Sequence, residues 1–211
     1  MNWYIWIVAA FIYLIFSAWY FNWNGALTPD EITSFVEAMQ ENSGQSPTDP
    51  EVIRNFLEVD DGKEFVMLNL VRLHTGEVAH PETGEMSTGP EILEGYFGPL
   101  SKAMFKRGGH PVFMGRKKGG HIDSWNAAAD EGFQVVGAMR YRSRRDLMIL
   151  ITDPRFSDSH KFKLAAIDGT ISFPMQLRIS TYLRPKIWVP ILLLLLASLG
   201  QNALYFFEMR K

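Results

Sequence analysis

The stretch Phe65–Leu73, with the sequence FVMLNLVRL, decides the fold because it is an almost continuous apolar run of strand length. Side chains of a strand alternate between its two faces, which gives the sets Phe65, Met67, Asn69, Val71 and Leu73 against Val66, Leu68 and Leu70. Both sets are apolar apart from the amide of Asn69. The run therefore predicts a strand in a sheet that is covered on both faces.

Further elements follow on both sides of this strand. Before it, Thr28, Pro29 and Glu31 form a capping box that predicts a helix to about Gln40. A second short helix is expected over residues 50–57. After the strand, the pattern predicts a polar loop (74–87), a helix with a kink at Gly95 before Pro99 (92–104), a strand (111–116), a turn (117–120), a strand (133–141), two helices (144–152 and 154–167) and a last strand (171–178).

The order strand, helix, strand, strand, helix, strand is that of the split βαβ, or ferredoxin-like, arrangement. We therefore expect an α+β domain over residues 62–180, after a helical connector over residues 24–61. Helices cover only one face of such a sheet. Because the first strand is apolar on both faces, the same sheet of a second copy is the most economical cover for the other face, which predicts a homodimer.

Two charge-free apolar stretches lie near the ends of the chain, at Trp3–Phe21 and Ile187–Phe207. As helices they are roughly 28 and 31 Å long, close to the ~30 Å hydrocarbon core of a bilayer. The expected transmembrane segments are residues 1–23 and 184–209. A cleavable signal peptide is the alternative for the first stretch, but no basic residue precedes it. A buried core helix is the alternative for the second, but Pro190–Leu199 is apolar on every face.

Several side chains of these stretches suit a bilayer and its interfaces. The tryptophans prefer the headgroup level, and the polar amides near the end of the second stretch either bond to other helices or reach the headgroups. The membrane-docking candidates are Trp3, Trp6, Trp19, Trp188, Gln201 and Asn202. The partners expected from this pattern are the lipid bilayer and other integral-membrane subunits.

Two spans place both termini on one side of the membrane and residues 22–186 on the other. The side of the domain stays undecided, because the positive groups that flank the spans are equal in number on the two sides when the α-amino group is counted. The whole chain has 21 basic and 23 acidic residues, so nothing indicates a nucleic-acid partner. No cysteine is present, which excludes disulfides, thiolate nucleophiles and zinc–thiolate sites.

Four motifs resemble a known family. They are VMLNLVR at Val66–Arg72, the glycines at 108 and 109, the single Trp125, and MRYRSRRDLMILITD at Met139–Asp153. In this order they are similar to the small dimeric α/β-barrel proteins of the uncharacterised stress-responsive type, over roughly residues 62–178. The resemblance implies a ferredoxin-like protomer, a dimer, and a cavity between sheet and helices, without a settled reaction. The chain departs from the family pattern at Arg142, where proline is common, and in the insertion 74–87.

Residues that suit such a cavity are few. The candidates for ligand binding are Asn69, Tyr96, Trp125, Tyr141 and His160. Four of them also have a structural interpretation: internal hydrogen bonds for Asn69, and core packing for His160 and the two tyrosines. Two basic patches, Arg116–Lys118 and the arginines at 140, 142, 144 and 145, suit either solvated strand ends or anion binding.

No catalytic constellation is visible. The five histidines make no pair at metal-ligand spacing, no nucleophile motif is present, and neither a metal nor a cofactor is expected. The sequence therefore favours a non-catalytic, membrane-anchored accessory or assembly subunit of a larger integral-membrane complex, with the domain as an interaction surface. The alternative is a membrane-tethered enzyme or binding protein that holds a small hydrophobic molecule in the cavity.

Overall fold

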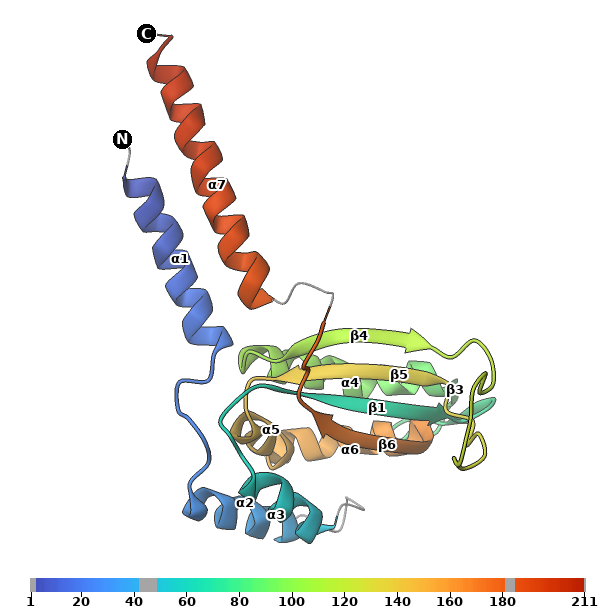
Figure 1. Ribbon diagram of the computed structural model, residues 1–211. Helices are drawn as coiled ribbons and strands as arrows, with labels where there is room; N and C mark the ends of the chain where they lie inside the picture. Colours follow the sequence, from blue (N-terminus) through green and yellow to red (C-terminus); the bar gives the residue numbers. More distant parts are fainter. Residues whose placement is uncertain (1–2, 42–48, 181–184, 211) are drawn as a thin grey trace. The chain divides into compact units, whose positions relative to one another are not determined.

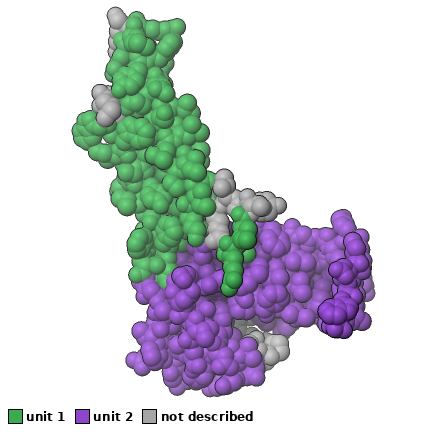
Figure 2. Space-filling model, viewed as in Figure 1, with its two compact units in different colours: residues 1–23, 177–211 green, residues 24–176 purple. Residues whose placement is uncertain are grey.

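The computed structural model describes residues 3–41, 49–180 and 185–210, and divides into two compact units (Figure 2). Unit 1 consists of residues 1–23 and 177–211, and unit 2 of residues 24–176. Residues 42–48 of the expected connector, and residue 184 at the start of the second expected span, lie outside the described ranges.

Unit 1 is a pair of helices, α1 (Tyr4–Tyr20) and α7 (Pro185–Glu208), which lie side by side (Figure 1). Their buried residues are Ser17 and Tyr20 on α1 and Ala197 and Gln201 on α7. Within the described part of the chain, α7 is the one helix long and apolar enough to cross a membrane, by length and composition. Helix α1 is also apolar but has only 17 residues. The expectation of two spans is thus supported for α7 alone.

Unit 2 is an α+β unit built on a four-stranded sheet. Its strands are β1 (Phe65–Leu73), β4 (His110–Arg116), β5 (Val135–Tyr141) and β6 (Ile167–Met175). They are arranged in the order β4-β5-β1-β6, and every neighbouring pair is antiparallel. Helices α4 (Gly89–Lys106), α5 (Arg144–Ile151) and α6 (Pro154–Ala166) lie behind the sheet in Figure 1, all on the same side.

Three details differ from the sequence-based prediction. The polar loop 74–87 contains a small hairpin of β2 (Glu77–Ala79) and β3 (Met86–Thr88), whose three-residue strands are too short for a periodic signal. Strand β6 begins at residue 167 rather than 171 and ends at 175 rather than 178, because it pairs with β1 from Val66 to Leu73. Strand β5 begins at residue 135 rather than 133, and residues 117–134 form no helix or strand beyond the expected turn.

Helix α4 continues through Pro99 as one helix. Gly95 is explained by close packing against α6, because a Cβ at that position would lie 2.8 Å from Cδ1 of Phe162. Gly95, where the sequence predicts a kink, therefore does not interrupt α4 and instead marks the close approach of α4 and α6.

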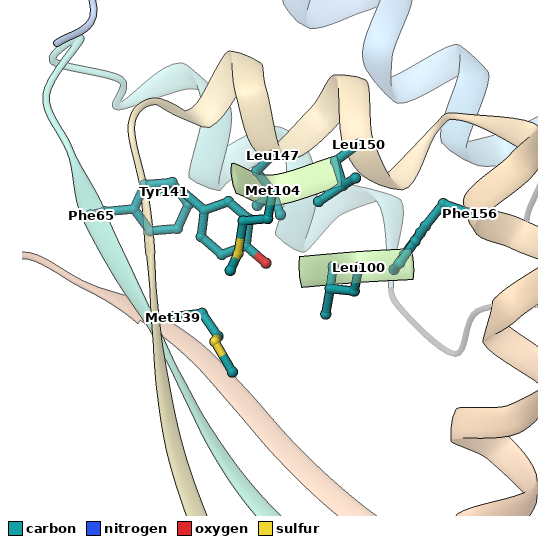
Figure 3. Close-up of a cluster of buried hydrophobic side chains, with 8 residues drawn as sticks. All are labelled: Phe65, Leu100, Met104, Met139, Tyr141, Leu147, Leu150 and Phe156. Carbon is teal, nitrogen blue, oxygen red and sulfur yellow. The ribbon is translucent and has the colours of Figure 1, made fainter. Parts of the chain in front are cut away.

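The main core lies between the sheet and its helices (Figure 3). Phe65 and Tyr141, paired across β1 and β5, stack with ring centroids 5.3 Å apart. Around them pack the buried side chains Leu100, Met104, Met139, Leu147, Leu150 and Phe156, which Figure 3 shows pointing inward from β5, α4, α5 and α6. The odd-numbered side of β1 therefore faces the helices.

A second core joins residues 24–61 to α5. Helices α2 (Pro29–Glu41) and α3 (Pro50–Glu58) contribute to a cluster around the fully buried Met148. The predicted capping box is present, since the backbone N–H of Thr28 donates to Glu31 at 2.8 Å. The carboxylate of Glu31 also pairs with Arg145, at 2.6 Å from its Nε. This segment is part of unit 2 and packs on helix α5.

The two faces of the sheet differ. We call the side away from the helices the open face; it carries Leu68, Leu70, Phe113, Val136, Ile171 and Phe173, by the alternation and the strand register. Phe113, Ile171 and Phe173 on the outer strands are exposed, at 45%, 42% and 42% of their surface. The apolar second face expected from the sequence therefore exists, and its outer strands are uncovered in the single chain.

Candidate functional site

Three of the five predicted ligand-binding residues meet between the sheet and its helices. Tyr96 on α4 packs against Phe156 and lies across from His160 on α6, with ring centroids 5.3 and 6.1 Å away. Tyr141 on β5 lies close enough for its charge to affect the ionisation of Tyr96. The ammonium of Lys163, one turn after His160, lies 5.6 Å from the centre of the Tyr96 ring. We call Tyr96, Tyr141, His160 and Lys163 the Tyr96 cluster.

Burial sets the electrostatics of this cluster. It raises the pKa of Tyr141 to about 12, and together with the field of Tyr141 it also raises the pKa of Tyr96. Burial lowers the pKa of Lys163, and burial and the neighbouring Lys163 lower that of His160. Both tyrosines therefore stay protonated at neutral pH and act as hydrogen-bond donors, while the imidazole is favoured in its neutral form.

Lys163 was not predicted from the sequence. Helix spacing in the sequence allows His160 to share a stripe with Phe156, Leu164 and Ile167. In the structure Leu164 is 54% exposed, and Lys163 takes the inward position instead. The spacings 156, 160, 163 and 156, 160, 164 fit a helix equally well, so the pattern could not choose between them.

Asn69 lies on the helix-covered face of the sheet. It belongs to a row of four paired residues that we call the Asn69 row: Met114, Gly137, Asn69 and Ser172. The amide of Asn69 donates to the carbonyl oxygens of Met67 at 3.1 Å and Gly137 at 3.4 Å, and accepts from the hydroxyl of Ser172 at 2.8 Å. These internal bonds satisfy Asn69, as its structural interpretation required.

The space over Gly137 in the Asn69 row is not filled by side chains. A Cβ added at Gly137 would meet no heavy atom within 4 Å, although this position faces the helix side of the sheet. Met114 beside it is 61% exposed. Free space therefore remains over Gly137 on the helix-covered face of the sheet, next to the Asn69 amide.

Trp125 does not join this group. It lies in the irregular segment 117–134 and is 85% exposed. The base of that segment is held by an ion pair between Lys117 and Asp130.

The membrane-docking candidates fall on different sides of the helix pair. Trp3, Trp6 and Trp188 are 65%, 37% and 42% exposed, Trp19 is half-buried, and Asn202 is exposed. Gln201 instead is buried in unit 1, and its two amide atoms have no hydrogen-bond partner among the described residues. A docking role through outward-facing atoms thus fits Asn202 better than Gln201.

The predicted arginine patch on β5 and α5 is neither solvated nor available to anions. Arg140 pairs with Glu64, Arg142 with Asp146, Arg144 with Asp60 and Arg145 with Glu31, at 2.7, 2.7, 3.5 and 2.6 Å. Three of these carboxylates lie far from the arginines in sequence. The patch therefore ties residues 31–64 to the sheet and α5.

Within the described ranges no group of three or more histidine, aspartate and glutamate side chains is placed to hold a metal ion. The chemistry that the Tyr96 cluster offers is that of hydrogen-bond donors and one cation beside apolar rings.

Comparison with known proteins gives little about function. No protein-family description matches the chain, and no curated protein matches it either. Among solved structures, it is similar to RPA0582, a protein of unknown function from Rhodopseudomonas palustris, with 25% identity and a TM-score of 0.53 over 64% of this chain and 98% of that one. The methylated form of RPA0582 gives 27% identity and a TM-score of 0.52 over 65% of this chain and 97% of the other.

Proposed function

We propose that this protein is a membrane-anchored α+β protein that binds a small, largely apolar molecule between its sheet and helices. The sequence alone favoured an accessory subunit, with this function as the alternative. The free space over Gly137 is the observation that makes us prefer the binding function to the accessory subunit. A packed core closes such space, whereas here the sheet floor is left open between the Asn69 amide and an exposed Met114.

The strand order supports a ferredoxin-like fold for unit 2. Omitting the β2-β3 hairpin, the sheet strands follow one another along the chain as β1, β4, β5 and β6, and the order β4-β5-β1-β6 places the first strand between the third and the last. This agrees with the split βαβ arrangement and with the resemblance to the dimeric α/β-barrel family. The similarity to RPA0582 spans nearly all of that protein but only about two thirds of this chain.

The membrane anchor in this proposal is unit 1. Helix α7 supplies one span, and we propose α1 as the second, because its 17 residues reach the lower end of the range for spanning helices. A hairpin of the two would keep both termini on one side. Apolar molecules concentrate in bilayers, so an anchor also keeps the binding site near its ligand.

Two glycines make a matched pair of variants for testing this function. Gly137 on β5 faces the helices, and Gly115 on β4 faces away from them on the open face; neither has a heavy atom within 4 Å of an added Cβ. Gly137→Val should fill the proposed binding space, while Gly115→Val makes the same change on the opposite face. Valine is favourable in strands, so both variants should fold.

The full chain, extracted from its own membranes in mild detergent, is examined by native mass spectrometry with identification of all components. The proposal predicts a bound small molecule in the wild type and in Gly115→Val, and its loss in Gly137→Val. Absence of any small molecule from the wild type, or its full retention in Gly137→Val, would refute the proposal.

A second candidate function, the accessory subunit, is favoured by the open face. Its exposed Phe113, Ile171 and Phe173 form an apolar surface on the outer strands that needs a cover. Either a second copy or another membrane subunit can supply that cover. In the same experiment this function predicts that Gly115→Val disrupts an assembly while Gly137→Val does not. Assemblies that are equal in all three proteins would contradict it.

A further inference from the structure

We propose that Lys163 is the counter-ion for an acid group on the bound molecule, so that the ligand is an apolar compound with one anionic oxygen group. This inference rests on the proposed binding function and adds the chemical class of the ligand. It draws on three observations about the Tyr96 cluster: an ammonium with no carboxylate partner among the described residues, neighbouring side chains that can donate hydrogen bonds, and apolar walls.

Among the described residues, the ammonium of Lys163 has no carboxylate partner. None of the ion pairs among the described residues involves it, and burial alone accounts for its altered ionisation. The contrast with its surroundings is clear. Lys161, two residues earlier, pairs with Glu82 at 2.8 Å, and the buried Arg140 pairs with Glu64 at 2.7 Å. A half-buried cation costs free energy unless an opposite charge offsets it, so the missing partner indicates a place for an anion.

Two polar residues beside Lys163, Tyr96 and His160, also favour an anion. Tyr96 presents a phenol that stays protonated, and His160 presents an imidazole with an N–H. An ammonium, a phenol and an imidazole N–H together offer several donors. Carboxylate oxygens accept such bonds, and bonds that involve a charged group are about twice as strong as neutral ones.

The walls around these donors are apolar. Tyr96 packs against Phe97 on its own helix and Phe156 on α6, with ring centroids 5.9 and 5.3 Å away, and Met67 lines the same core from β1. An inorganic anion would gain nothing from these rings. A molecule with an acid group at one end and a hydrocarbon body fits both parts of the site.

The first test uses octanoate and octanol, which share a hydrocarbon body and differ in the acid group. The full chain in mild detergent is labelled with trace acetic anhydride, and acetylation of each lysine is measured by mass spectrometry at equal free concentrations of the two probes. Octanoate should slow acetylation of Lys163 at least about fivefold more than octanol does, without affecting Lys161 or Lys102. Equal effects of the two probes, or no protection by octanoate up to its solubility limit, would overturn the inference.

The second test uses matched variants and isothermal titration. Lys163→Met should bind octanoate at least about tenfold more weakly than the wild type and bind octanol equally well. Lys161→Met should bind both as the wild type does. A wild type that binds octanol and octanoate equally, with both excluded by Gly137→Val, would leave the binding function intact and refute the role of Lys163. A wild type that binds neither probe would refute both.

Discussion

Replacing Leu57 by alanine tests whether residues 24–61 belong to the α+β unit or only link it to the helix pair. Leu57 on α3 is fully buried in a cluster with Leu27, Ile32, Val36 and Met148, and Met148 belongs to α5. Leucine-to-alanine changes at such sites cost about 2–5 kcal/mol, from lost burial and from the cavity that remains. Four surrounding apolar side chains suggest a value near the middle, about 3 kcal/mol.

The expected shift follows from this free energy. With a urea dependence of about 2 kcal/mol per molar, a loss of about 3 kcal/mol moves the unfolding midpoint down by about 1.5 M. Pulse proteolysis of the full chain in detergent measures that midpoint, provided that it is read from peptides of the sheet rather than of α3 itself. Such peptides report whether the loss spreads from the helix to β1 and β5.

Val52→Ala is the matched control, because Val52 lies on the same helix and is 61% exposed. It should change the free energy of unfolding by no more than about 0.5 kcal/mol. If Leu57→Ala leaves the midpoint of the sheet peptides where Val52→Ala leaves it, residues 24–61 are a mere connector and the second core is not a stabilising part of unit 2.

Three further outcomes are expected. Gly62 has φ +70°, and a Cβ there would lie 2.8 Å from the backbone of Gly25 and Ala26. Gly62→Ala should therefore destabilise unit 2 by more than about 1 kcal/mol, whereas Gly137→Ala should cause no measurable loss of stability. Equal urea midpoints for the two variants would be evidence against this difference. Hydrogen bonds to Arg145 and Thr28 lower the pKa of Glu31 to about 2, so the stability that its carboxylate adds is complete above pH ~4.5 and lost as the pH falls towards 2. The difference in urea midpoint between the wild type and Glu31→Gln should therefore narrow as the pH falls. A difference that stays constant with pH would contradict the ion pair. Gln201→Leu should stabilise the helix pair by about 1 kcal/mol, because it removes a buried amide that has no hydrogen-bond partner among the described residues. Steric trapping or denaturation in detergent measures this change. Loss of a co-purifying subunit from the variant would instead reveal an external partner for Gln201.

The parts of the fold that depend on local patterns could be predicted from the sequence. The bounds of β1 are those of the apolar run Phe65–Leu73, and the Thr28–Glu31 capping box begins α2 as expected. The signals were local in both cases: a strand length bounded by polar residues, and a cap whose donor and acceptor are three residues apart.

The parts that depend on distant contacts could not. Arg145 reads as one of four arginines in a basic patch, and nothing near it in sequence reveals that Glu31, 114 residues away, neutralises it. Lys163 is the opposite case, because nothing in the sequence distinguishes it from Lys161, yet it faces the Tyr96 ring and has no carboxylate partner among the described residues. Which cations are paired is decided by tertiary contacts, and the candidate site depends on that distinction.

The free space over Gly137 was also invisible in the sequence. A glycine in a strand suggests a bulge or a close approach of another chain segment. The structure shows neither at Gly137 itself, because the register shift between β4 and β5 lies at Pro111–Phe113 and no atom approaches the missing side chain. Only the spatial arrangement of α4 and α6 over the sheet distinguishes a packed glycine, such as Gly95, from an unfilled one.

The most direct test of the binding function is a crystal structure of the full chain purified from its own membranes without added ligand. The account predicts electron density for a small molecule over Gly137, with its body against Tyr96 and its polar end towards Lys163. A site over Gly137 closed by protein side chains, or empty while a second protein covers Phe113, Ile171 and Phe173, would contradict it.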